Sequence, residues 1–260
     1  MSVLDGFTTG TVTYDGQPKT VHRRGDGPGV VVVHEMPGIT PSVAAFGRRV
    51  ADRGFTVVMP SLFGTDGRAP SGAYLAATAI RACVSREFTC FATGRSSPAA
   101  RWLRALAADL HDELGGPGVG AVGMCFTGGF ALAMMVEDAV AAPVLSQPSL
   151  PLAVGRRRAR SVGLSDDEIL RVAARAEEGC PVLGLRFTED RAVPAARFEA
   201  LREILGDAFV AVEIDSSPGN PWGIPRRAHS VLTEDLVDEP GHPTREALER
   251  VLGFFEERLR

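Results

Sequence analysis

The sequence has few cysteines, and their spacing indicates neither a metal site nor a redox motif. Cys83, Cys90, Cys125 and Cys180 form no CxxC pair and have no His-x-x-His companion. Structural zinc sites and thiol–disulfide motifs are recognised by such short spacings. We therefore expect reduced thiols in a cytoplasmic protein that holds no metal.

Long apolar runs and basic surfaces are also scarce. The start, MSVLDGFTTG, lacks the basic segment and apolar stretch of an export signal, and the most apolar helix candidate, Phe130 to Val136, ends at two acidic residues. The formal net charge of −4 disfavours a phosphate backbone as partner, because such binding relies on clustered Lys and Arg. We expect neither a membrane nor a nucleic-acid partner.

No internal repeat and no Rossmann glycine pattern occurs, so a dinucleotide is not predicted. What is present is an ordinary globular composition, with 45% apolar and 23% charged residues. Such a chain can bury enough apolar surface to offset the entropy lost on folding. We expect residues 1–260 to form a single domain.

Short β-branched runs alternate with helical periodicity, which predicts an α/β fold with a mostly parallel sheet and helices on both faces. The expected strands are Val30–Glu35, Phe55–Ser61, Val119–Cys125, Ala141–Pro148, Pro181–Phe187 and Phe209–Asp215. Ser97 and Ser165 are expected to cap the helices that follow them. The stretch 64–98 is predicted to form a loop or small helices over the active site.

One strand-to-helix junction carries the strongest chemical signal. Gly123-Met124-Cys125-Phe126-Thr127-Gly128 has the layout of a nucleophile elbow, in which small residues flank a reactive side chain at a tight turn. Amides of the helix start can stabilise both a thiolate and a developing oxyanion. The alternative is that Cys125 is only a small buried apolar residue, as free cysteines commonly are. The coincidence of strand, glycines and helix favours the nucleophile.

A thiol nucleophile needs a base and an orienting acid, which follow it along the chain in this type of fold. His229 and His242 are the two histidines after Cys125. His242 stands just before a predicted helix, where a capping or surface role is expected, so we favour His229 in its long loop. Asp190 and Glu189 both follow the Pro181–Phe187 strand, and either could supply the acid.

These landmarks resemble the dienelactone hydrolase family, a cysteine-using branch of the α/β-hydrolases. The resemblance runs from about Val30 to the closing helix and rests on four motifs in order. They are His34-Glu35-Met36-Pro37-Gly38, the G-x-C-x-x-G elbow, Asp190-Arg191-Ala192-Val193-Pro194 and His229-Ser230.

The resemblance implies the α/β-hydrolase fold and a Cys125, His229, Asp190 triad, with Asp190 rather than Glu189 as the acid. It also implies that Glu35 lies close to the thiol and helps to move its proton, where burial would raise the pKa of that carboxyl. The backbone amides of Phe126 and Met36 would form the oxyanion hole. The implied reaction cleaves an ester or lactone through a thioester and needs no cofactor.

The sequence departs from the family at substrate recognition. Members that act on dienelactone are expected to hold its carboxylate with arginines, one of them shortly after the catalytic histidine. Here Ser230-Val231-Leu232-Thr233 follows His229, which favours a less acidic ester or lactone. Arg81 or Arg86 could supply a cation, and the alternative for each is an ordinary surface arginine.

Two other functions remain open from the sequence. A relative that binds a ligand without turnover would keep the fold, because a fold alone does not establish activity. An acyltransferase would use the same acyl-enzyme with an alcohol or thiol in place of water. We expect a monomer or homodimer acting on a small-molecule ester or lactone.

Overall fold

Eight strands form one sheet in the order β1-β2-β4-β3-β5-β6-β7-β8. The computed structural model describes residues 2–84 and 97–260, without the side chains of residues 81–84. The strands are β1 (Thr8–Tyr14), β2 (Gln17–Arg24), β3 (Gly29–Val33), β4 (Thr56–Pro60), β5 (Val119–Met124), β6 (Val140–Ser146), β7 (Val182–Phe187) and β8 (Phe209–Ile214).

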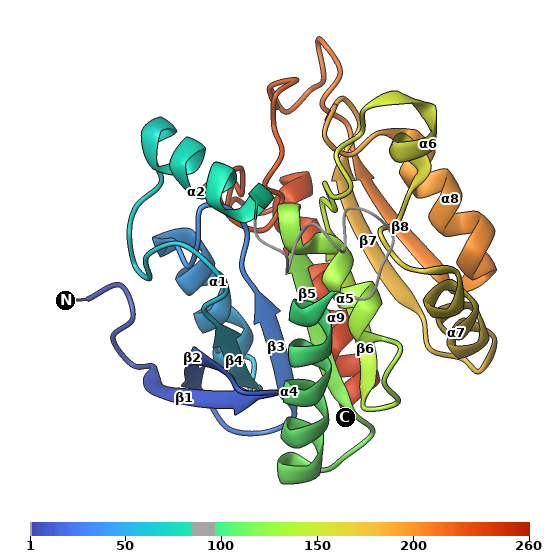
Figure 1. Cartoon of the computed structure of the whole chain (residues 1–260). Helices are drawn as coiled ribbons and strands as arrows, with labels where there is room; N and C mark the ends of the chain where they lie inside the picture. The colour runs from blue at the N-terminus through green and yellow to red at the C-terminus, as the bar shows by residue number, and fades with distance from the viewer. Residues whose placement is uncertain (1, 85–96) are drawn as a thin grey trace.

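The sheet is parallel from β4 to β8 and antiparallel only where β1 pairs with β2 and β2 with β4. The predicted α/β class and the mostly parallel sheet are therefore confirmed. Because parallel strands share a direction, their carboxyl ends lie along one edge, where ligands gather in open α/β sheets. In Figure 1 the loops after these strands reach toward the upper part of the view.

Helices cover both faces of the sheet (Figure 1). On one face, α1 (Pro41–Asp52) and α9 (Pro243–Leu259) pack with alternate residues of the central strands. On the other, the apolar cluster includes residues of α4 (Pro98–Leu114), α5 (Gly128–Met134), α7 (Asp166–Glu177) and α8 (Ala195–Leu205). Two more helices, α2 (Gly72–Val84) and α6 (Gly155–Arg160), lie in connecting segments.

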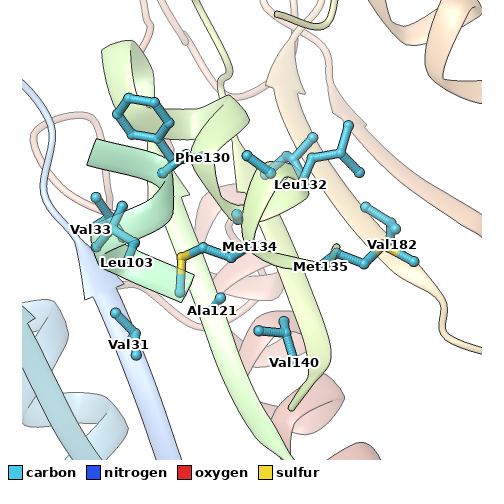
Figure 2. Close-up of a cluster of buried hydrophobic side chains, with 14 of the residues drawn as sticks. Val31, Val33, Leu103, Ala121, Phe130, Leu132, Met134, Met135, Val140 and Val182 are labelled. Carbon is cyan, nitrogen blue, oxygen red and sulfur yellow. The ribbon is translucent and has the colours of Figure 1, made fainter. Parts of the chain in front are cut away.

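The helix that follows the predicted nucleophile is buried along its whole length. Every residue of α5 is buried. Figure 2 shows α5 side chains packed with side chains of α4 and of the strands; the labelled residues are Val31, Val33, Leu103, Ala121, Phe130, Leu132, Met134, Met135, Val140 and Val182. Full burial of each large apolar side chain contributes about 1.5–3 kcal/mol. This packing fixes the helix start, and with it the turn that carries Cys125.

The helix starts follow the sequence signals in part. Ser165 accepts a hydrogen bond from the Glu168 N–H at 3.4 Å and so caps α7 as predicted. Ser97 occupies the N-cap position of α4 but makes no side-chain cap bond. Within the stretch 64–98, residues Gly72–Val84 form α2. In the described part of the chain, no helix has the length and apolarity required to cross a membrane.

Candidate active site

The candidate residues come from segments that follow different parallel strands. Glu35 follows β3, Cys125 follows β5 directly, and Asp190 follows β7. His229 lies in the long connection between β8 and α9. The strand directions therefore bring residues that are distant in sequence to the same edge of the sheet.

The backbone at Cys125 is in the left-handed region. Its φ is 53°, in a 3-10 turn between β5 and α5. A non-glycine residue in this region is strained by about 1–3 kcal/mol, and the surrounding packing must hold it there. The Thr127 hydroxyl contributes by accepting a hydrogen bond from the Met124 N–H at 3.2 Å. It also lies 3.0 Å from the carbonyl oxygens at the end of β3, which ties the turn to the neighbouring strand.

The glycines beside Cys125 leave no room for side chains. A Cβ at Gly123 would lie 2.3 Å from the Thr127 carbonyl oxygen, and a Cβ at Gly128 would lie 2.5 Å from Cα of Pro148. Both contacts are with backbone, which cannot turn aside as a flexible side chain can. The small residues of the G-x-C-x-x-G pattern are thus needed for close backbone approach.

We expect Gly128→Ala to destabilise the protein by about 2 kcal/mol, because the added methyl overpacks against the Pro148 backbone. Gly253→Ala is the matched control. A Cβ at Gly253 in α9 meets nothing within 4 Å, and the change should stabilise its helix by about 0.5–1 kcal/mol. Urea unfolding of both variants measures the two effects. Equal stability of the two variants would contradict the packing account.

His229 and Asp190 are directly hydrogen-bonded. The distance from Nδ1 of His229 to Oδ2 of Asp190 is 2.6 Å, and Asp190 is buried. The Ala192 N–H donates to Oδ1 of Asp190 at 2.9 Å and fixes the carboxylate. Glu189, the other acid considered from the sequence, instead accepts hydrogen bonds from Arg226, the shorter at 2.6 Å.

The other histidine considered has a structural position. His242 is the N-cap of α9, and its Nδ1 accepts a hydrogen bond from the Thr244 N–H at 3.3 Å. The capping role expected for it is confirmed. The backbone of His229, in contrast, is held by Asp235, whose Oδ2 accepts hydrogen bonds from the amides of His229 and Ser230 at 2.8 and 2.9 Å.

The charge state of His229 follows from its two partners. Burial of the imidazole lowers its pKa, but hydrogen-bond and electrostatic interactions with Asp190 and Cys125 outweigh burial and raise the pKa of His229 to about 11. The imidazolium is therefore favoured at neutral pH. Cys125, His229 and Asp190 form a connected series in which a proton on the ring can serve the sulfur.

Glu35 lies in a buried polar network. Its Oε2 accepts hydrogen bonds from the Ser230 hydroxyl at 2.7 Å and from Nε2 of Gln147 at 3.2 Å. Its Oε1 accepts one from the Thr233 hydroxyl. Ser230 and Thr233 belong to the segment in which the family's arginine was expected. Glu35 thus binds the loop of His229 through hydroxyls, and the hydrogen bonds found for its carboxylate do not include one to Cys125.

Burial raises the pKa of Glu35 above its ordinary value of 4.5, although hydrogen bonds from Thr233 and Ser230 oppose the shift. A carboxyl with a raised pKa in the folded state adds stability at low pH that is lost as pH rises through that pKa. We expect the unfolding free energy of the wild type, relative to Glu35→Gln, to be greatest below pH 4.5 and to fall at higher pH. Urea unfolding across pH measures it; a relative stability that grows with pH would contradict the assignment.

Residues after β6 complete this edge, and the sequence analysis missed them. Gln147 bonds Glu35, and Oγ of Ser149 lies 3.6 Å from Sγ of Cys125. Their signal was available, because polar side chains directly after a parallel strand lie at the ligand-binding edge. Gln147 lies within the run Ala141–Pro148, whose pattern predicts a strand, and Ser149 directly follows that run.

An apolar surface lies beside the turn. The ring of Phe63 packs edge-on against His34 and Phe126, with centroids 4.4 and 6.0 Å away. Met36 and Leu62 are partly buried against the same core cluster as Cys125. Burial lowers the pKa of His34 to about 4, and its Nε2 accepts the Leu62 N–H at 3.0 Å, so this ring is neutral and structural.

The other candidate residues are a second cysteine and two arginines, and the structure describes only the cysteine in full. Cys180 is buried, and burial raises the pKa of its thiol, so it lacks the setting of Cys125. The side chain of Arg81, in α2, and the whole of Arg86 lie outside the described residues. Among the side chains that the structure does describe, no three His, Cys, Asp or Glu groups gather so as to hold a metal ion.

A sequence profile of the dienelactone hydrolase family matches residues 12–259. The chain belongs to the dienelactone hydrolase family. Membership identifies it as a hydrolase of the dienelactone hydrolase type within the α/β-hydrolases. No curated protein matches the sequence.

Solved structures of dienelactone hydrolases and related proteins share the fold. A dienelactone hydrolase from Anabaena variabilis superposes with a TM-score of 0.62 at 16% identity over 98% of each chain. A dienelactone hydrolase-like promiscuous phosphotriesterase from metagenomic libraries gives 0.61 at 19%, covering 98% of this chain and 100% of that one. A cold-adapted esterase from an Arctic intertidal metagenomic library gives 0.59 at 13%, covering 97% and 93%. At such identities the likeness establishes the fold.

Proposed function

We propose that the protein hydrolyses carboxylic esters or lactones through a thioester on Cys125. The observation that carries this proposal is the junction itself: a cysteine with φ of 53° after β5, which helps to raise the pKa of an imidazole that lies 2.6 Å from Asp190. A turn of this kind presents the thiol at the sheet edge, and the imidazole can accept its proton.

In the proposed cycle, the Cys125 thiolate attacks the substrate carbonyl carbon while His229 carries the proton. The carbonyl π electrons move to oxygen, and the resulting oxyanion accepts hydrogen bonds from the amides of Met36 and Phe126. When the carbonyl re-forms, the C–O bond to the leaving group breaks and His229 protonates that oxygen. Water, deprotonated by His229, then hydrolyses the thioester and releases the thiolate.

Asp190 and Glu35 have supporting roles in this proposal. Asp190 accepts the Nδ1–H of His229 and so keeps Nε2 directed toward the sulfur and the substrate. Burial raises the pKa of Glu35, so its carboxyl keeps a proton to a higher pH than a solvated carboxyl does. Its bonds to Ser230 and Thr233 would transmit a change in its charge to the loop of His229.

The substrate is proposed to be a small ester or lactone with an apolar portion. Phe126 follows Cys125 directly and the ring of Phe63 packs edge-on against Phe126, so these two side chains supply apolar surface beside the nucleophile. No arginine follows His229 at the positions that Ser230 and Thr233 occupy. Arg81 and Arg86 stay our candidates for binding a substrate carboxylate, and we place the enzyme in the cytoplasm.

Turnover in ¹⁸O-labelled water tests the proposal. The wild type is incubated with a short-chain p-nitrophenyl ester and with a small unsubstituted lactone. The masses of the products are then measured by mass spectrometry. We expect a carboxylic acid that carries one solvent oxygen. Absence of turnover of every ester and lactone by folded protein, or products that carry only an added alcohol or thiol, would contradict hydrolysis.

A further inference from the structure

The side chain of Ser149 is held against the sulfur of Cys125. Its Oγ lies 3.6 Å from Sγ, within hydrogen-bonding range for sulfur. Its backbone N–H donates to the Cys125 carbonyl oxygen at 2.9 Å. Ser149 is only 5% exposed, so its hydroxyl has little access to water as an alternative partner. Two contacts therefore fix this hydroxyl relative to the thiol.

Arg197 fixes the loop that carries Ser149. This arginine of α8 is 1% exposed, and its guanidinium donates to the carbonyl oxygens of Pro148, at 2.7 Å, and Pro151. It also donates to the carbonyl oxygens of Arg158 and Ser161, at 3.0 and 2.9 Å. The guanidinium thus binds the chain on both sides of Ser149. A buried group with several charge-assisted hydrogen bonds holds a loop more tightly than solvent-exposed contacts can.

We propose that Ser149 is a further catalytic residue whose hydroxyl donates a hydrogen bond to the Cys125 sulfur when that sulfur is a thiolate. The inference rests on the proposed function of Cys125. No bond forms or breaks at Ser149, and its proton stays on Oγ throughout. The hydrogen bond weakens as negative charge moves to the substrate oxygen and strengthens when hydrolysis of the thioester releases the thiolate. Ser149 therefore stabilises the nucleophile at rest and as a leaving group.

The other polar side chains near the sulfur are ionisable groups, and Ser149 differs from them in being neutral. His229 approaches the thiol with its ring, and Asp190 acts on the far nitrogen of that ring. Glu35 is bonded to hydroxyls and to an amide. Ser149 is thus the neutral donor found in contact with Sγ among the described residues. Hydrogen bonds to charged acceptors are stronger than neutral ones, so its loss should be measurable.

Alkylation of Cys125 by iodoacetamide across pH tests the role without any substrate. The peptide that contains Cys125 is followed by mass spectrometry, which separates it from the other cysteines. In Ser149→Ala we expect alkylation near pH 6 to slow by about tenfold and the pH midpoint to rise by about one unit. Ser161→Ala is the matched control. It removes a hydroxyl that accepts a hydrogen bond from the Gly163 N–H on the far side of α6, in the same connection between β6 and α7, and it should keep the wild-type profile.

The outcomes separate this inference from the proposed function. A wild-type Cys125 that reacts no faster than buried Cys180 would overturn both. A reactive wild-type Cys125 with an identical pH profile in Ser149→Ala would overturn only the role of Ser149. Thermal unfolding checks that the variant is folded, and Ser149→Gly removes the same hydroxyl if the alanine variant is not.

Discussion

Cys125→Ala is expected to lower kcat/KM for activated esters by at least about 10³-fold. Removing the nucleophile leaves only binding and oxyanion stabilisation, which account for a small part of the rate in acyl-transfer enzymes. The effect should fall on kcat, because the sulfur acts in bond formation and contributes little to ground-state binding. Steady-state hydrolysis of p-nitrophenyl esters measures both constants.

Cys180→Ala is the matched control for this prediction. Cys180 is a buried thiol whose sulfur lies 3.7 Å from the backbone carbonyl oxygens of Val140 and Ala141 in β6. Its replacement should leave kcat and KM within about twofold of the wild type. Cys180 lies away from the reacting atoms, so losing its sulfur affects mainly the stability of the fold. Full activity in Cys125→Ala would contradict the proposed nucleophile.

His229→Ala is expected to lower kcat by about 10³-fold. The variant loses the group that accepts the thiol proton, protonates the leaving oxygen and activates water, and general acid–base catalysis contributes about 10²–10⁴-fold. His229 contacts Asp190, which can orient its ring, whereas Nδ1 of His242 contacts the hydroxyl of Thr244. Pre-steady-state kinetics should show both acylation and deacylation slowed.

His242→Ala distinguishes this role from a general effect of removing a histidine. His242 caps α9, so its loss should cost about 1 kcal/mol of stability. Activity measured well below the unfolding temperature should stay close to that of the wild type. An inactive His242→Ala enzyme beside an active His229→Ala enzyme would contradict the assignment of the base.

Much of the fold could be predicted because the central strands carry a strong signal. The strands β3 to β8 correspond to the six apolar runs identified in the sequence, with boundaries shifted by one or two residues. The pair β1 and β2 was missed, since β1 is mostly exposed and has no apolar run. The helix α8 was also missed, although it carries the buried Arg197.

The candidate site was predictable where a residue type and its place in chain order were enough. Cys125 has a local motif, and His229 and Asp190 follow it in the order typical of the fold. Ser149 and Thr233 could not be assigned in that way. Their roles depend on how the segment after β6 and the connection between β8 and α9 pack at the sheet edge. Local sequence does not specify that packing. Thr233 stands near the position of an expected arginine and instead donates a hydrogen bond to Glu35.

The hydroxyl partners of Glu35 determine which influence dominates the pKa of its carboxyl. A carboxylate beside an arginine would stay charged, whereas hydroxyl partners leave burial as the dominant influence on its pKa. The structure therefore favours a carboxyl that can carry a proton. That property could not be assigned from the motif His34-Glu35-Met36 alone.

The most direct measurement is the mass of the protein during turnover of a slow ester. Rapid acid quenching, digestion and mass spectrometry should find the acyl group on the peptide that contains Cys125, as a thioester that hydroxylamine removes. The same experiment on Cys125→Ala should find no adduct. An acyl group on another residue, Ser149 included, or steady turnover by the alanine variant would contradict the account.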